Sequence, residues 1–171
     1  MRPEVPDDFA AIDRLQLAAF DDPQIPPLVA AIRADAGYLP ELALVAETNN
    51  GVVGQIMVSA TDLMTDEHGR LRILMLSPLG VDPGCQGQGI GSALVQAALE
   101  IADARPEPIT IVQGHPGYYP RFGFVRGRSI GILPPSHLGP IDQAWMARPG
   151  PTWTPALRGR VAYPQHFLDL D

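Results

Sequence analysis

Glycines cluster at a point where the sequence pattern changes from an extended strand to a helix. They occupy positions 84, 87, 89 and 91 within residues 81–92, and an apolar helical repeat follows directly. Because glycine has no Cβ, several backbone N–H groups of such a turn can converge on one ligand, and the dipole of the following helix adds positive potential. The segment therefore predicts a binding loop for a phosphate or pyrophosphate. The alternative is a tight packing turn without a ligand.

Three known phosphate-binding patterns can be compared with this loop. The dinucleotide fingerprint G-x-G-x-x-G fails, because Gly87 and Gly89 would require a third glycine at Ser92. The P-loop fails because the chain contains no lysine at all. The pattern Q/R-x-x-G-x-G/A fits, with Gln86, Gly89 and Gly91 at its fixed positions.

The fitting pattern resembles the acyl-CoA loop of the GNAT superfamily of N-acetyltransferases, and the resemblance covers most of the chain. Residues 38–46, 79–94, 117–124 and 159–163 are similar, in family order, to segments of its YhbS-like branch. The resemblance implies an α/β fold with a mixed, mostly antiparallel β-sheet, flanking helices and splayed central strands. It also implies an acyltransferase that moves an acetyl group from acetyl-CoA, its cosubstrate, to an amine by direct attack.

The resemblance assigns roles to the loop and to the strand before it. The backbone of Leu79, Gly80 and Val81 is expected to hold the pantetheine arm of the cosubstrate. A backbone N–H near Val81 would polarise the thioester carbonyl, as an oxyanion hole does. The loop amides would bind the pyrophosphate, and they belong to Gln86, Gly87, Gln88, Gly89, Ile90, Gly91 and Ser92.

One tyrosine matches the family's Tyr-x-x-x-Gly-Phe element, which spans residues 119–124 here. By resemblance, Tyr119 is the general acid that protonates the departing CoA thiolate, whose thiol has a pKa of about 8.5. The alternative is a tyrosine that only packs on the cosubstrate. The neighbouring Tyr118 is expected to face elsewhere, in a structural or substrate-lining role.

The general base is not evident from the sequence. In several family members it is a glutamate on the strand before the loop, but residues 70–81 contain no carboxylate. His115, at the end of the following strand, is one candidate, and its alternative role is to cap the turn before Pro116. Glu41 and Asp62 are weaker candidates. Water, or an amine that is already partly neutral, would need no named base.

Other reactive residue types give weaker indications. Cys85 lies inside the loop, but no histidine is adjacent in sequence, so we interpret it as a non-nucleophilic loop residue. The histidines lack metal-ligand spacing, and no metal is predicted; they are His68, His115, His137 and His166.

Three arginines and both tryptophans each leave two interpretations open. The arginines could form a basic rim for the cosubstrate's phosphates or a solvated surface, and the tryptophans could wall the acceptor pocket or pack over the sheet. They are Arg121, Arg126, Arg128, Trp145 and Trp153.

Apolar spacing indicates the helices that position these residues. A first helix is expected at residues 9–20, with Asp7 as its cap, and a second at 25–36, ending at Gly37. The helix after the glycine loop is expected at residues 89–104, because Pro106 terminates it.

Strands are expected on both sides of that loop. Two of them, at residues 42–46 and 52–60, flank an Asn49-Asn50-Gly51 turn, which is typical of a hairpin. A third covers residues 70–76 and resumes to Val81. Because Pro78 cannot donate to a ladder, this strand should be bent, bulged or unpaired there. Residues 109–113 and 124–133 are further expected strands, separated by a loop and a helical turn at 114–122.

Length and composition are those of one folded domain. The chain has 171 residues, of which 46% are apolar and 18% charged. We therefore predict a single domain over residues 1–171, with its Pro-rich part at 134–171 included. Strands that alternate with helices support the α/β class independently of the resemblance.

Charge and cysteine usage limit the partners and the compartment. The net charge of −7 disfavours a nucleic-acid binder, which needs a basic surface, and it favours a cationic acceptor. No apolar run approaches the about 18 residues that cross a bilayer, so no membrane partner is expected. One cysteine and no secretory pattern predict a cytoplasmic protein. The lack of lysine beside many alanines, prolines and arginines suggests a bacterial source.

Alternatives of other classes stay open at this point. The chain could be a non-catalytic acyl-CoA-binding or sensing module of the same fold. It could also acylate a hydroxyl, or use a longer acyl chain. The sequence leaves the acceptor undefined, and it does not decide between a monomer and a homodimer.

Overall fold

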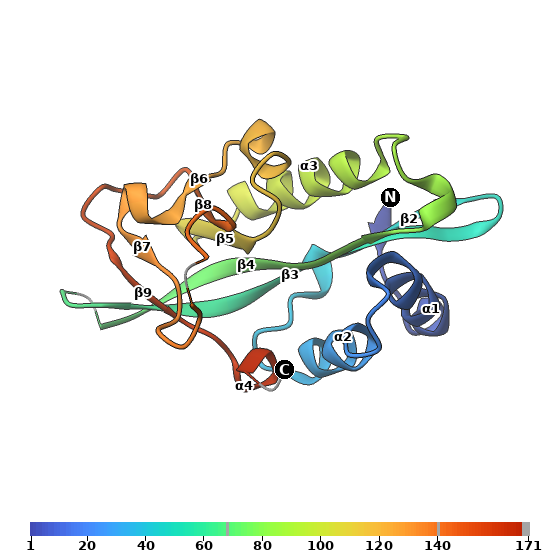
Figure 1. Ribbon diagram of the computed structural model, residues 1–171, viewed down its shortest axis with the longest axis horizontal. Helices are drawn as coiled ribbons and strands as arrows, with labels where there is room; N and C mark the ends of the chain where they lie inside the picture. The colour runs from blue at the N-terminus through green and yellow to red at the C-terminus, as the bar shows by residue number, and fades with distance from the viewer. Residues whose placement is uncertain (68, 140, 169–171) are drawn as a thin grey trace.

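The computed structural model describes residues 1–67, 69–139 and 141–168. Within them, one mixed sheet runs through the molecule, and most neighbouring strands are antiparallel (Figure 1). Its main order is β1-β2-β3-β4-β5-β8-β6, and β9 attaches to β3 and carries β7. The strands are β1 (Arg2–Pro3), β2 (Ala43–Thr48), β3 (Gly51–Thr65), β4 (Gly69–Val81), β5 (Ile109–Gln113), β6 (Val125–Arg126), β7 (Ile132–Leu133), β8 (Trp145–Pro149) and β9 (Gly159–Ala162).

Helices cover both faces of the sheet. The helix α3 (Ile90–Asp103) lies on one face, and α1 (Phe9–Phe20), α2 (Ile25–Ala34) and α4 (Gln165–Leu168) lie on the other (Figure 1). Strand β2 contributes side chains to the cores on both faces of the sheet, because successive side chains of a strand point to opposite faces. Leu44 packs in the core under α3, and Val45 packs in the core under α1 and α2.

The helix after the glycine loop approaches the sheet closely because Gly54 of β3 has no side chain. A Cβ there would lie 2.9 Å from both Ile90 Cγ2 and Leu94 Cδ1. The apolar face of α3 continues through Val95 and Ala98, which are fully buried. This contact fixes the first turn of α3, and with it the loop, against the strand that pairs with β4.

Strands β4 and β5 part at the centre of the sheet. Their parallel pairing joins Leu74–Leu76 to Thr110–Val112 and ends there. In the β3–β4 ladder, Ile56 pairs with Leu79 but Val58 pairs with Leu76, so the cis-linked Ser77-Pro78 pair forms a bulge opposite a single residue. The expected irregularity at Pro78 and the splayed central strands are both confirmed.

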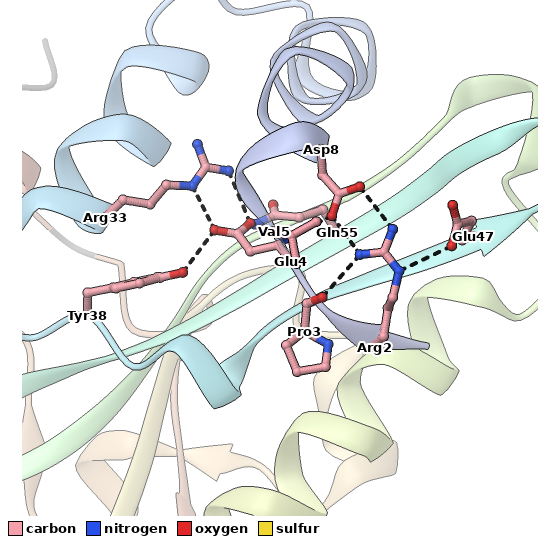
Figure 2. A network of polar contacts seen from close by, with 9 residues as sticks. All are labelled: Arg2, Pro3, Glu4, Val5, Asp8, Arg33, Tyr38, Glu47 and Gln55. Atoms are coloured by element: carbon pink, nitrogen blue, oxygen red, sulfur yellow. Dashed lines mark hydrogen bonds and ion pairs between the residues drawn. The ribbon is translucent and has the colours of Figure 1, made fainter.

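A buried polar network anchors the helices of the α1–α2 face. Figure 2 shows Glu4 accepting hydrogen bonds from Arg33 Nε at 2.7 Å, Tyr38 Oη at 3.1 Å and Gln55 Nε2 at 3.2 Å. Burial, and then the negative charge of Glu4, raise the pKa of Tyr38 to about 12. A buried carboxylate is tolerated only where it is paired in this way, so the network fixes α2 and β3 relative to each other.

The helix boundaries largely follow the predictions. The range 9–20 is confirmed, and the second and third helices are slightly shorter than expected, at Ile25–Ala34 and Ile90–Asp103. The predicted cap is wrong: Asp7 lies within a 3-10 turn, Pro6–Asp8, and Asp8 directly precedes α1. The Asp8 carboxylate accepts a hydrogen bond from the backbone N–H of Val5 at 2.9 Å and pairs with Arg2 (Figure 2).

The predicted strand at 124–133 is also wrong. A 3-10 turn, Gly127–Ile130, separates the short strands β6 and β7. A Cβ at Gly127 would lie 2.5 Å from the Trp145 ring, and Gly131 has a positive φ of 79°, so the chain bends where an extended strand was expected. The Pro-rich remainder, left unassigned from sequence, supplies β8, β9 and α4.

Candidate active site

The glycine loop forms an open cradle of backbone N–H groups at the start of α3. Gly87 and Gly89 have positive φ angles of 76° and 84°, conformations that favour glycine. The first backbone hydrogen bond of α3 is donated by Ala93 N to Gly89 O. The N–H groups of the residues before Ala93 therefore have no partner inside the helix. Aligned N–H groups at the positive end of a helix bind anions.

Two side chains hold the loop against the strand that precedes it. Gln86 Nε2 donates to the carbonyl of Val81 at 3.1 Å, and the Asp82 carboxylate accepts from Gly84 N at 2.8 Å. These bonds close the turn between β4 and α3. The glutamine of the motif therefore has a structural partner within the chain.

A cavity of about 420 Å³ opens against this cradle, and we call it the loop cavity. Among the described residues that line it there is no carboxylate, and one arginine, Arg121, borders it. Arg126 and Arg128 are not among them, and Arg128 pairs with Asp142 instead. Of the three arginines for which a basic rim or a solvated surface was considered, Arg121 alone borders the loop cavity. The lining consists of Leu79, Val81, Cys85, Gln86, Gly87, Gly89, Ile90, Gly91, Ser92, Tyr118 and Arg121.

Beyond Leu76, strand β4 has no paired strand on the β5 side among the described residues. Asp82 N donates to Val53 O on β3 at 2.9 Å. Because successive N–H groups of a strand point to opposite sides, those of Val81 and Leu79 point away from β3, toward the side that β5 has left. A linear ligand can therefore pair with this edge, as a strand would. Gly80 is buried, and a Cβ there would lie 2.5 Å from Gln16 Oε1 on α1.

Tyr119 stands at the far end of this split. Its ring is 8% exposed and packs edge-on against Phe124, and a Cβ at Gly114 would overlap it. Its hydroxyl has no hydrogen-bond partner within residues 1–67, 69–139 and 141–168. Burial, with a smaller contribution from Tyr118, raises the pKa of Tyr119 to about 12. The phenol is therefore a proton-bearing donor at physiological pH.

Tyr118 faces a different direction from Tyr119, as the sequence analysis expected, and its side chain turns toward the loop. Its hydroxyl lies 3.5 Å from Ser92 Oγ, and a Cβ at Gly91 would lie 3.0 Å from it. The ring lines the loop cavity and also the larger cavity described below. This position fits the lining role, one of the two roles that the sequence analysis gave for this residue. The adjacent positions of the two tyrosines gave no signal about which one turns toward the glycines.

His115 is held in one tautomer. Gly117 N donates to its Nδ1 at 3.1 Å, so in the neutral ring the proton resides on Nε2. In that form neither ring nitrogen has a free lone pair. The histidine caps the turn before Pro116 and Gly117, which was the alternative role considered for it.

A second, larger cavity of about 550 Å³ continues from Tyr119 through the split between β4 and β5. We call it the through-sheet cavity. Tyr118 and Tyr119 line it from the α3 side, and Phe20, Ile25 and Leu28 line it from the α1–α2 side. Leu79 and Tyr118 border both cavities, so the two are adjacent. Sequence reasoning missed the side of this cavity that Phe20, Ile25 and Leu28 line, because the residues around the cavity come from segments far apart in the chain.

The remaining candidates lie elsewhere. Glu41 pairs with Arg105, and Asp62 lies 3.4 Å from Arg70 on β3 and β4. Trp145 is fully buried and donates to Ile132 O at 2.9 Å, and Trp153 packs on the same core. Neither tryptophan borders the through-sheet cavity, so of the two interpretations packing over the sheet is the correct one.

Metal ligands do not gather in this structure. Across the described residues, no group of three or more His, Cys, Asp and Glu side chains could hold a metal ion. His68 lies outside the described residues. In the same part of the chain, no helix combines the length and the apolar character needed to cross a membrane.

Comparison with known families decides the family. Residues 40–126 match a family described as an acetyltransferase (GNAT) domain. The uncharacterized N-acetyltransferase YhbS of Escherichia coli K12 is 33% identical over 125 residues, which cover 72% of each chain. The chain belongs to the GNAT superfamily. The GNAT match contains the split strands, the glycine loop and both tyrosines.

Solved GNAT structures resemble the whole chain. A crystal structure of Escherichia coli YhbS in complex with CoA has a TM-score of 0.86 and 26% identity, and covers 99% of this chain and 92% of that one. A GNAT acetyltransferase from Brucella melitensis in complex with acetyl-CoA has a TM-score of 0.75 and 28% identity, and covers 97% and 96%. The GNAT fold, with its mixed and mostly antiparallel sheet, thus includes the Pro-rich C-terminal elements.

Proposed function

We propose that this chain transfers the acetyl group of acetyl-CoA to the nitrogen of an amine. The observation that carries the proposal is the split between β4 and β5, which joins an anion cradle on one side to a cavity containing Tyr119 on the other. The two similar GNAT structures hold CoA and acetyl-CoA, which supports the same cosubstrate here. Acetyl-CoA and a single half-buried thiol, Cys85, support a cytoplasmic location.

The cradle and the strand edge would bind the cosubstrate along its length. The N–H groups of residues 86–92 would take the pyrophosphate, with Arg121 nearby. The outward backbone groups of Leu79 and Val81 would pair with the amides of the pantetheine arm. Such pairing resembles the addition of a strand to an open sheet edge. It would direct the thioester toward Tyr119.

The oxyanion contact fits Leu79 better than Val81. Both N–H groups point into the split, but only Leu79 borders the through-sheet cavity, where the acyl group would meet its acceptor. Val81 borders the loop cavity alone. We therefore assign the polarising N–H to Leu79 and a pantetheine contact to Val81. One such donor typically contributes about 10²–10³ in rate.

Tyr119 would stabilise the leaving sulfur mainly as a hydrogen-bond donor. Its pKa of about 12 exceeds that of a thiol, about 8.5, so complete transfer of its proton to the thiolate is unfavourable. A hydrogen bond from its hydroxyl, which belongs to a buried ring, still favours the developing thiolate charge. The attacking nitrogen carries an extra proton after C–N bond formation and can supply it to the sulfur. The products, amide and free thiol, then balance without a further donor.

His115 does not act as the base in this scheme. In its neutral form the ring presents Nε2–H, which donates rather than accepts. The amine would attack in its neutral form, and water would remove the proton that leaves before attack. This scheme keeps the open alternative in which no side chain serves as base.

The proposal is tested in two measurements on the purified protein. Calorimetry measures CoA binding, and mass spectrometry measures acetylation of a panel of amines together with release of CoA. We expect CoA binding and acetylation of at least one amine class. CoA binding without acetylation of any class would identify a binding or sensing module instead, and acetylation of alcohols alone would identify an O-acyltransferase.

A further inference from the structure

The acceptor half of the through-sheet cavity has an apolar and uncharged wall. Six residues form this wall: Phe20, Ile25, Leu28, Leu138, Tyr163 and Phe167. They come from α1, α2, α4 and the segments next to β7 and β9. Among the described residues that line the cavity there is no Asp, Glu or Arg. The volume of about 550 Å³ lies in the range of small-molecule sites.

Asp35 and Asp62 lie near this wall but do not line the cavity. Asp35 lies 3.7 Å from His166 Nδ1, and Asp35 and Asp62 line a separate pocket on the other side of Tyr163. Burial raises the pKa of Tyr163, whose hydroxyl lies 3.4 Å from Gln113 Oε1, so it is neutral. A cation that entered the cavity would therefore lose water without meeting a carboxylate among the residues that line it.

We propose that the acceptor is an amine on an uncharged, apolar body, such as an arylalkyl or aliphatic amine, seated against the wall of Phe20, Leu28 and Phe167. This inference rests on the proposed function and narrows its substrate class. The wall is continuous with Tyr119 and Leu79, so an amine seated there reaches the acyl end of the split. An apolar site also lowers the pKa of the amine, which supplies the neutral nucleophile that a site without a base requires.

Two opposing effects bear on a cationic acceptor. The net charge of −7 attracts cations at long range, but salt screens such attraction beyond about 8 Å. Burying an unpaired ammonium in an apolar cavity is unfavourable at short range and is not screened. The local effect is the larger one, so the wall excludes polyamines and basic peptides although the overall charge attracts them.

The first experiment compares hexylamine with 1,6-diaminohexane as acceptors of acetyl-CoA. The two differ by one additional, charged amine at the end that would lie against the wall. We expect kcat/KM for hexylamine to be about tenfold higher or more, a ratio typical of apolar-pocket discrimination. Equal or better use of the diamine would overturn the inference while leaving N-acetyl transfer in place. Acetylation of no amine would overturn the proposed function and the inference together.

The second experiment places a charge in the wall at an exposed position. Phe20 is 44% exposed at the end of α1, so Phe20→Glu does not create a buried charge in the core. Leu17→Glu is the matched control, because Leu17 lies on the same helix, is 46% exposed and is outside the cavity. We expect Phe20→Glu to lower kcat/KM for hexylamine about tenfold. The preference for hexylamine over 1,6-diaminohexane should become smaller or be reversed. Leu17→Glu should change neither.

Two further outcomes decide against the inference. Unchanged kinetics in a folded Phe20→Glu protein would show that the acceptor does not contact the wall. The third measurement uses octanoyl-CoA with hexylamine. A preference for octanoyl-CoA over acetyl-CoA that Phe20→Glu abolishes would assign the cavity to a longer acyl chain. Unchanged CoA affinity in both variants shows that either result reports on the through-sheet cavity and not on the cradle.

Discussion

At the scale of single residues, the two adjacent tyrosines have different surroundings and therefore different expected roles. Tyr119 is buried against Gly114 and Phe124, and its hydroxyl has no hydrogen-bond partner among the described residues, whereas Tyr118 reaches toward Ser92 and stacks under Arg121. The sequence motif selects Tyr119 by its spacing to the Gly-Phe pair. The motif carries no information about the neighbour, because a 3-10 turn rotates adjacent side chains into different directions.

We predict that Tyr119→Phe lowers the single-turnover rate of acetyl transfer by about 10²-fold, the lower end of a proton donor's contribution. The ring packing is retained, so CoA affinity should change little. The effect should appear in kcat and kcat/KM alike, since the hydrogen bond strengthens only as the sulfur becomes charged. Single-turnover kinetics with rapid mixing measure this rate, because they isolate the chemical step.

Tyr118→Phe is the matched control for that variant. Its hydroxyl lies beside the glycine cradle, so its loss should affect CoA affinity more than the rate of the chemical step. Because the pKa of Tyr119 is about 12, its ionisation should not limit the rate below about pH 11. Equal single-turnover rates in wild type and Tyr119→Phe would remove Tyr119 from the mechanism.

Gly89 provides a second prediction at this scale. With a φ of 84°, it favours glycine, and a β-branched residue would force the loop amides out of register. Each charge-assisted hydrogen bond lost corresponds to about 1.5–3 kcal/mol, or about 10- to 150-fold in affinity. Gly89→Val should therefore weaken CoA binding by at least about tenfold in calorimetry.

Gly69→Val controls for backbone strain alone. Gly69 also has a positive φ, of 64°. It begins β4, whereas the loop follows the other end of that strand at Val81, about 40 Å from Gly69 at the usual rise of a strand. This variant should lose stability and retain CoA affinity. If Gly89→Val bound CoA as tightly as Gly69→Val does, the loop would not be the pyrophosphate site.

At the scale of elements, local signals determined how much could be predicted. The hairpin at Asn49-Asn50-Gly51, the strand–glycine–helix unit and the disruption at Pro78 each depend on neighbouring residues, and each was predicted. The strands β6 to β9 are short and depend on partners far along the chain. Trp145 of β8, for example, donates a hydrogen bond to Ile132 O and pairs with Gln113 of β5, and no periodicity of its own segment indicates either partner.

An ion pair links β8 to the end of α3, and it predicts that the stability of the fold depends on pH. Arg148 on β8 holds the Asp103 carboxylate at the end of α3 through bonds of 2.6 and 2.8 Å. These bonds hold the pKa of Asp103 below its usual 3.8. A depressed carboxyl pKa contributes stability that is present above the unfolded-state pKa and is lost as pH falls through the folded-state value.

We therefore predict that Asp103→Asn lowers the free energy of unfolding by about 1–2 kcal/mol at neutral pH, allowing for partial exposure of the pair. The difference from wild type should shrink as the pH falls below about 4. Urea unfolding at pH 7, 5 and 3 measures it. Asp142→Asn, in the exposed pair with Arg128, should change stability by less than about 0.5 kcal/mol. A deficit in Asp103→Asn that persisted undiminished at pH 3 would contradict the assignment.

At the scale of the whole molecule, the site exists only where two layers meet. The cradle belongs to α3 and its loop, whereas most of the acceptor wall belongs to α1, α2 and α4, which lie on the other face of the sheet (Figure 1). The motif for the cradle is contiguous in sequence, so it could be predicted. The wall gathers Phe20, Leu138 and Phe167 from widely separated positions, and only the folded sheet with its split brings them together.

A ligand that bridges the loop and the open edge of β4 should stabilise the native state as a whole. At a CoA concentration about a hundredfold above Kd, mass action adds about 2.7 kcal/mol, because the unfolded chain has no site. For a chain of this size, that corresponds to a rise in Tm of about 5–11 °C. Thermal unfolding with and without CoA measures the shift. It should fall to about half or less in Gly89→Val, whose CoA affinity is at least about tenfold weaker, and persist in Phe20→Glu, because the first change lies in the cradle and the second only in the acceptor wall. A loss of the CoA shift in Phe20→Glu would mean that the two cavities do not serve separate substrates.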